Sequence, residues 1–355
     1  MQWTPDVAAG EWLRERLDRT WQPPFSMHMV VPRGFPAYAR ILHPATRERP
    51  VGRAWPPVPH DAHAKAWAAF AAARPEIDTE HVRWSEVART FGTRLHADSQ
   101  WGRLVGYTDP YNNDEVEDAA GWRYNDPEQG RLDPDTLAAI AALLATHTTT
   151  PDAGCVTLWE GWGGLLGFMG SMSASASFGF TGEAPSAPQR GEAEPGAPGS
   201  DDSPYTPGTV AQPAIAYTSL EAMQARSIHN PWHDGYAKER WIPGVLSDEI
   251  SRGPRLKLPN RAHVLFSAGI DAFVDASWPE RAPWADPTAP GFTQSPSMIW
   301  PEDRAWVLVT EIDFDSTVVA GSPALIAAIC ADPALEALPI PAEAVLGWEH
   351  GSDSR

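Results

Sequence analysis

The sequence predicts an α+β fold, with a mixed and mostly antiparallel sheet, helices packed on it and a disordered insertion that interrupts it. Three observations favour this class. Segments typical of strands and helices do not alternate regularly, as they would in a doubly wound sheet. The first half of the chain supplies too few strands to close a sheet alone. A tract rich in Ser, Ala, Gly and Pro, residues 171–213, separates that half from the later strands.

Apolar spacing predicts the first elements in chain order. Trp and Leu residues at helical spacing predict a helix over 10–21. Apolar runs predict strands over 27–32 and 34–43, joined by a Pro-Arg-Gly turn. An Ala-rich segment predicts a helix over 61–73, and a capping aspartate opens another over 78–89.

The clearest helix of the chain is predicted over 135–147. Asp133 supplies its cap and Pro134 its first turn, which are the positions that a helix N-terminus favours. The polar, acidic and aromatic segment before it, 108–130, predicts an ordered loop. An apolar run after it, 155–160, predicts a strand that ends at a glycine-rich turn.

Four further segments follow the Ser/Ala/Gly/Pro-rich tract. Apolar runs predict strands over 261–267 and over 304–312, and the second leads to an acidic end at 313–315. The Pro- and Trp-rich segment 278–301 predicts a loop, and a capped Ala-rich segment predicts a helix over 322–330.

One domain in two parts is the predicted organisation. Residues 1–170 form its first part, residues 171–213 a flexible insertion, and residues 214–350 its second part. Residues 183–213 contain too few apolar side chains to offset the entropy lost on ordering, so we expect them to be disordered.

Charge and composition restrict the partners. The 355 residues include 27 Lys and Arg against 46 Asp and Glu, a formal net charge of −19. Such a charge is repelled by nucleic acid and by anionic membranes, so we expect neither as a partner. No apolar run reaches the roughly 18–20 residues of a membrane span, and no secretory signal is predicted. With two separated cysteines, Cys155 and Cys330, the chain is expected to be cytoplasmic with free thiols.

Two aspartates at the end of the 304–312 strand are the candidate catalytic residues, Asp313 and Asp315. The segment Asp-Phe-Asp-Ser-Thr-Val resembles the first motif of haloacid-dehalogenase-like phosphatases. That resemblance implies Asp313 as the phosphoryl-accepting nucleophile and Asp315 as the acid/base, both near Mg²⁺. The later motifs of that family are absent, and no lysine follows the segment.

A second interpretation makes the same segment structural. On an extended strand, Glu311, Asp313 and Asp315 would share an outward face, while Leu308 and Phe314 would point into a core. Under this interpretation the carboxylates form a solvated surface and a Ser-Thr turn follows the strand.

Tryptophan and proline suggest a binding surface. The chain has 17 Trp and 36 Pro, often adjacent, which favours ordered loops anchored by indoles. The candidate binding residues are Trp278, Trp284, Trp300, Trp306 and Glu311. Exposed indoles on a negative surface would suit a basic protein partner. Glycan binding by the same indoles is a third interpretation.

Other chemistry has weaker sequence support. The pairs His60/His63 and His229/His233 do not match a helical zinc motif, and we expect them to be structural. No Gly-x-Ser-x-Gly nucleophile motif is present in the sequence.

Segments 31–44 and 296–317 resemble those of a group of proteins from GC-rich Gram-positive bacteria to which no activity is assigned. The resemblance implies one continuous fold and no particular function. From the residues we expect a non-enzymatic acidic binding or interaction protein without a cofactor. The alternative is a metal-dependent hydrolase or phosphoryl-transfer enzyme that uses Asp313 and Asp315, with Mg²⁺ as its ion.

Overall fold

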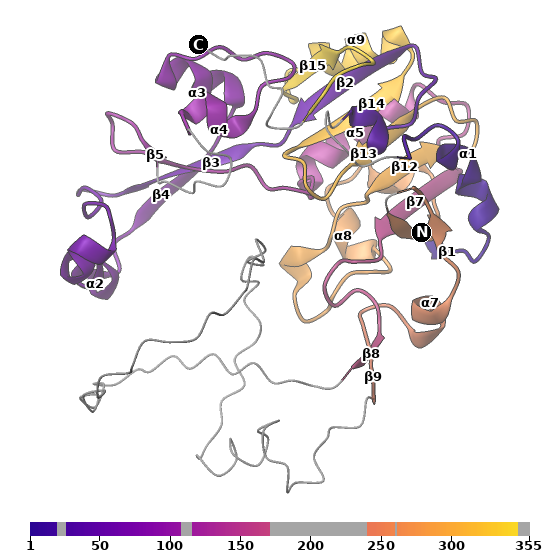
Figure 1. The fold of residues 1–355 in the computed structure, drawn as a ribbon, viewed down its shortest axis with the longest axis horizontal. Helices are drawn as coiled ribbons and strands as arrows, with labels where there is room; N and C mark the ends of the chain where they lie inside the picture. The colour runs from indigo at the N-terminus through magenta and orange to yellow at the C-terminus, as the bar shows by residue number, and fades with distance from the viewer. Residues whose placement is uncertain (20–25, 108–115, 171–239, 260, 347–355) are drawn as a thin grey trace, which may run out of the picture. The chain divides into compact units, whose positions relative to one another are not determined.

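A computed structural model describes residues 1–19, 26–107, 116–170, 240–259 and 261–346 (Figure 1). The chain divides into two compact units. The larger is built from residues 1–167 and 243–355, and the smaller from residues 168–242. The part of the chain that the model describes contains no helix long and apolar enough to cross a membrane.

One antiparallel sheet forms the centre of the larger unit, and nine of its strands lie among the described residues. The strand order is β1-β11-β7-β12-β13-β14-β2-β15, and β10 also pairs with β11. The bounds are Gln2–Trp3 (β1), Ala37–Leu42 (β2), Gly154–Trp159 (β7), Leu256–Lys257 (β10), Ala262–Ser267 (β11), Met298–Pro301 (β12), Val307–Thr310 (β13), Ser316–Gly321 (β14) and Ala337–Ile340 (β15). Strands from both ends of the chain therefore share one sheet.

Two helices cover one face of this sheet, α5 (Pro134–Ala145) and α9 (Pro323–Ala331) (Figure 1). Their apolar side chains pack with Ile41, Val156 and Val319 of the strands in one core cluster. Both helices begin as the sequence predicts, because Asp133 and Ser322 each accept a hydrogen bond from a backbone N–H of the first turn. The predicted α+β class is confirmed.

The N-terminal segment packs on the opposite face of the sheet. It contains α1 (Glu11–Arg14) and 3-10 turns at Val7–Gly10 and Met27–Met29. Their apolar side chains form a second cluster with Leu265 and Val309, which alternate along their strands with residues of the first cluster.

A second sheet of the larger unit has the order β4-β3-β6-β5 among the described strands. The bounds are Ala45–Pro50 (β3), Ile77–Val82 (β4), Val116–Glu117 (β5) and Arg123–Asn125 (β6). Among the described residues, the remaining helices are α2 (Ala64–Ala73), α3 (Trp84–Phe91), α4 (Trp101–Val105), α7 (Asp248–Arg252) and α8 (Trp278–Arg281). Further 3-10 turns lie at Asp61–His63, Ile270–Phe273 and Pro290–Phe292. Helices α3 and α4 pack with this sheet around Trp84 and Tyr124 in a third core cluster.

The smaller unit is described only at its two ends. There β8 (Phe168–Gly170) pairs antiparallel with β9 (Arg240–Ile242). The predicted disordered insertion, residues 171–213, lies outside the described residues, and the proposed domain bounds at its ends stay a prediction.

Two predicted elements of the N-terminal half are wrong in type. Residues 27–29 form a 3-10 turn and not a strand, because the Ser26 hydroxyl accepts the His28 N–H and begins a turn. Residues 78–82 are strand β4 and not the start of a helix, because they pair along the whole of β3. The helix starts only at Trp84, where the Glu336 carboxylate accepts the first backbone N–H groups.

Other predicted elements are wrong in extent. The helix expected over 10–21 has α-helical geometry only over Glu11–Arg14, since Arg16 N–H already bonds back to Leu13 in a tighter turn. The expected loop 108–130 contains the short strands β5 and β6, and its residues 108–115 lie outside the described chain. The expected loop 278–301 ends in a central strand, β12, which tolerates Pro301 because proline stands at the last position of that strand.

Candidate functional site

The acidic segment 311–315 is a turn and not the end of a strand. Strand β13 ends at Thr310, and the Phe314 N–H donates to the Glu311 carbonyl to close the turn before β14 begins. The Ser-Thr turn expected after it is instead the first pair of β14. The three carboxylates therefore do not share one outward face: Glu311 is buried, Asp313 is exposed and Asp315 is half-buried.

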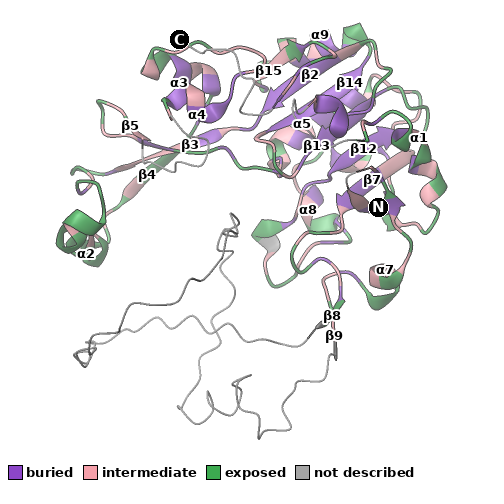
Figure 2. Cartoon of the chain, in the orientation of Figure 1, coloured by how far each residue is buried: buried purple, intermediate pink, exposed green. Residues whose placement is uncertain are grey.

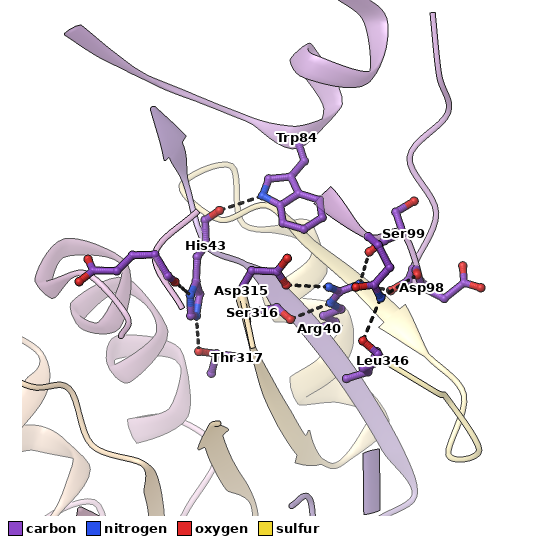
Figure 3. Close-up of polar contacts among 12 residues, drawn as sticks. Arg40, His43, Trp84, Asp98, Ser99, Asp315, Ser316, Thr317 and Leu346 are labelled. Atoms are coloured by element: carbon purple, nitrogen blue, oxygen red, sulfur yellow. Dashed lines mark hydrogen bonds and ion pairs between the residues drawn. The ribbon is translucent and has the colours of Figure 1, made fainter. Parts of the chain in front are cut away.

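Arg40 anchors the Asp315 end of this turn (Figure 3). Its side chain is 1% exposed and donates to the Asp315 carboxylate at 3.0 Å and to the Ser316 hydroxyl at 2.8 Å. The same guanidinium donates to the carbonyls of Ala97 and Ser99 at 3.2 and 2.7 Å. These acceptors, and the Trp84 ring 5.5 Å away, compensate the buried charge.

Arg261 anchors the other end. It donates to Glu311 Oε1 at 2.5 and 2.9 Å and to Asp313 Oδ2 at 2.7 Å. The Trp159 ring lies 5.0 Å from the guanidinium. Burial raises the pKa of the Glu311 carboxyl, and the neighbouring Arg261 charge opposes that rise. Two of the three carboxylates thus share one arginine, and the third has its own.

A cleft of about 230 Å³ opens beside the turn. Its polar wall includes the carboxylates of Asp126, Asp313 and Asp315, and Tyr107 donates its hydroxyl to Asp126 at 3.3 Å. The full lining is Arg40, Gln100, Trp101, Gly102, Tyr107, Asp126, Pro127, Gln129, Asp313, Phe314, Asp315, Ser316 and Leu346. Asp313 and Asp315, the candidate catalytic residues, are brought together in this cleft, whereas Glu311 is not part of its lining.

The carboxylates do not form a metal-ligand cluster. Within the described residues, no group of three or more His, Cys, Asp or Glu side chains is placed to hold a metal ion. The countercharge beside Asp313 and Asp315 is supplied by arginine side chains. Mg²⁺ at this turn, expected under the hydrolase alternative, therefore has no such cluster to support it.

The four candidate binding tryptophans are buried. Strand β12, which contains Trp300, is buried along its whole length (Figure 2). Trp278, Trp284 and Trp306 belong to the first core cluster, and Trp300 belongs to the second. The indole N–H of Trp306 donates to the Leu144 carbonyl at 3.1 Å, and that of Trp284 to the Gln294 carbonyl at 2.8 Å. The exposure expected for them is wrong, because each of the four indoles packs into a core cluster of the sheet.

Sequence reasoning missed His43, which lies beside Asp315, where its backbone N–H donates to the Asp315 carbonyl at 3.0 Å (Figure 3). Its Nε2 is 2.9 Å from the Thr317 hydroxyl, which is itself 2.9 Å from the Thr310 hydroxyl. Its Nδ1 is 2.7 Å from the Glu128 carbonyl. Burial lowers the pKa of His43 below its ordinary value, which favours a neutral ring. The one sign of it in the sequence is that His43, a polar residue, directly follows the apolar run that forms β2.

His263 is another buried histidine that the sequence did not indicate. It is 3% exposed and lines a small cavity with Arg261 and Glu311. Burial lowers its pKa to about 3. Cys155 and Cys330 are free thiols, as expected, and burial raises the pKa of Cys155 to about 11, so neither is an activated nucleophile.

The His263 pKa predicts a loss of stability in acid. Unfolded histidine binds a proton near pH 6.5, whereas folded His263 stays neutral down to about pH 3, so protons favour the unfolded chain over that range. At pH 5 this contributes roughly 2 kcal/mol of destabilisation. We expect His263→Gln to flatten the fall in unfolding free energy between pH 6.5 and 5, measured by urea titration at each pH.

His81→Gln is the matched control, because His81 is an exposed residue of β4. It should leave the pH dependence as in the parent chain. An equal slope in the His263 variant and the parent would contradict the prediction. The raised pKa of Glu311 acts in the opposite sense, since the folded carboxyl binds its proton at higher pH than the unfolded one, and it remains in both variants.

Comparison with family models, curated proteins and solved structures found no match to this chain. The proposal for its function therefore rests on its own residues.

Proposed function

We propose that this chain is a non-enzymatic binding protein and that its cleft receives a cationic group of a basic protein partner. The observation that carries the proposal is the charge of the cleft wall. Three aspartates face one arginine there, and Arg40 is already engaged by a carboxylate, a hydroxyl and two carbonyls. The cleft thus keeps a net negative charge.

Two of its carboxylates are open to solvent. The Asp313 side chain is 61% exposed although it pairs with Arg261, and Asp126 is an exposed residue of the same lining. Carboxylates in such positions can accept charge-assisted hydrogen bonds from a guanidinium or an ammonium group. The formal charge of −19 over the whole chain would steer a basic partner toward them.

The rest of the wall suits the stem of a long basic side chain. Trp101, Pro127, Phe314 and Leu346 contribute apolar surface to the same cleft. Arginine and lysine place their methylene groups on such surface while the charged head meets the carboxylates.

Binding has more support here than catalysis. The described lining contains neither histidine nor cysteine, and its one serine, Ser316, is buried and accepts a hydrogen bond from Arg40. A hydrolase or phosphoryl-transfer enzyme using Asp313 and Asp315 remains the alternative. It would need a divalent ion at carboxylates that now face arginine.

A labelled oligoarginine peptide tests the proposal by fluorescence anisotropy. We expect binding at low salt that weakens as salt is raised, because screening acts over about 10 Å at 0.1 M. Replacing both exposed carboxylates, Asp126→Asn with Asp313→Asn, should weaken binding at least about tenfold, equivalent to roughly 1.4 kcal/mol.

The control replaces two exposed aspartates outside the cleft, Asp61→Asn with Asp271→Asn, and makes the same change in net charge. It should bind the peptide within about twofold of the parent chain. Equal weakening in both double variants would mean that overall charge and not the cleft binds the peptide, and it would refute the proposal. Mg²⁺-dependent turnover of a phosphoester that Asp313→Asn abolishes would favour the enzyme alternative.

A further inference from the structure

The His263 imidazole is buried without a hydrogen-bond partner. It is 3% exposed on β11, opposite Trp159 of β7 and Leu256 of β10, and neither ring nitrogen has a partner among the residues that the model describes. A buried polar group in this state costs roughly 1–3 kcal/mol. A buried water molecule or another ligand at the ring would remove that cost.

The cavity that His263 lines also has two methionines, whose sulfur atoms are polarisable, in its lining. Its volume is about 10 Å³, close to that of one probe sphere, so it holds a single small atom or ion. The lining includes the thioether side chains of Met29 and Met298, each 3% exposed, and the Arg261–Glu311 ion pair. His263, Met29 and Met298 therefore line one space of atomic size.

We propose that this cavity is a binding site for a soft monovalent metal ion, copper(I), with His263, Met29 and Met298 as its ligands. Thioether and imidazole are the ligand types that copper(I) selects, and a trigonal set of this kind leaves no demand for carboxylate. A single positive charge also fits the surroundings, because Arg261 and Glu311 balance each other beside it.

Harder or more highly charged metal ions fit this set of one imidazole and two thioether ligands less well. Mg²⁺ and Ca²⁺ take six or more oxygen ligands, and Glu311 is the only carboxylate in the described lining, already held by Arg261. Structural zinc takes four ligands, usually thiolate or imidazole.

The experiment measures copper(I) affinity under nitrogen, with ascorbate as reductant and a chromophoric copper(I) chelator as competitor. Because free thiols also bind copper(I), the full chain carries Cys155→Ala and Cys330→Ala in all samples. We expect a single ion per chain in competition with the chelator. Met298→Leu and His263→Gln should each weaken binding by at least the roughly 10–100-fold that loss of an outer-shell partner costs.

Met27→Leu is the matched control, since Met27 is equally buried in the same core cluster and does not line the cavity. It should leave copper(I) affinity unchanged, and Met298→Leu keeps the packing volume so that folding is preserved. No binding in competition with the chelator would overturn the proposal and leave the cavity to a water molecule. Equal affinity in the parent, Met298→Leu and Met27→Leu chains would overturn it as well.

Discussion

Replacing Arg40 with methionine should lower the unfolding free energy by about 3–5 kcal/mol, measured by urea denaturation. The substitution keeps an apolar stem of similar length but removes the guanidinium. It therefore leaves the Asp315 carboxylate, the Ser316 hydroxyl and the carbonyls of Ala97 and Ser99 without the donor that satisfies them. Unpaired acceptors in a buried place cost more than the ion pair itself contributes.

Arg33→Met serves as the control for this prediction. Arg33 also pairs with an aspartate, Asp18, at 2.7 Å, but its side chain is 52% exposed. Solvent can replace that pairing, so the loss should stay below about 1 kcal/mol. Equal losses in the two variants would mean that Arg40 is not buried as the fold requires. Combining Arg40→Met with Asp315→Asn should cost less than the sum of the single changes, since the pair is coupled.

Gly130→Ala should cost about 2–5 kcal/mol and disturb the acidic turn, because two penalties combine. Gly130 has φ +68°, a left-handed conformation that costs a residue with a Cβ about 1–2 kcal/mol. A Cβ here would also lie 2.5 Å from the Ile312 carbonyl oxygen and 2.6 Å from its Cα, so the backbone of the turn must move. The peptide affinity of the cleft should fall together with stability.

Gly52→Ala separates the two penalties. Gly52 has nearly the same φ, +70°, but no atom lies within 4 Å of a Cβ built there. It should lose only the conformational cost of about 1–2 kcal/mol and keep its affinity for the oligoarginine peptide. If Gly130→Ala were no worse than Gly52→Ala, the close contact between Gly130 and the acidic turn would be contradicted.

Elements with a strong local signal could be predicted from the sequence. Helices α5 and α9 have caps and prolines at their starts, and β7 and β11 are apolar at most positions. The strands that were missed, such as β4 and β12, are specified by their partners. Ile77–Val82 is polar at most positions, and it is extended because it pairs with β3.

The candidate site could be predicted only in part. Asp313 and Asp315 were indicated by their spacing, and the structure places both in a cleft. Their arginine partners could not be found from sequence, because Arg40 and Arg261 lie far from the turn along the chain and join it only through strand order. The four candidate tryptophans were wrongly expected at the surface, because composition gives the number of indoles and not their burial.

The position of β2 in the strand order has a consequence for synthesis on the ribosome. This strand is translated long before both of its neighbours, β14 and β15. Until those two strands emerge from the ribosome, the nascent chain carries an apolar strand with both edges unpaired, a state that invites aggregation or chaperone capture. Emergence of β14 and β15, and not local helix formation, should then be the event that permits the native sheet to close.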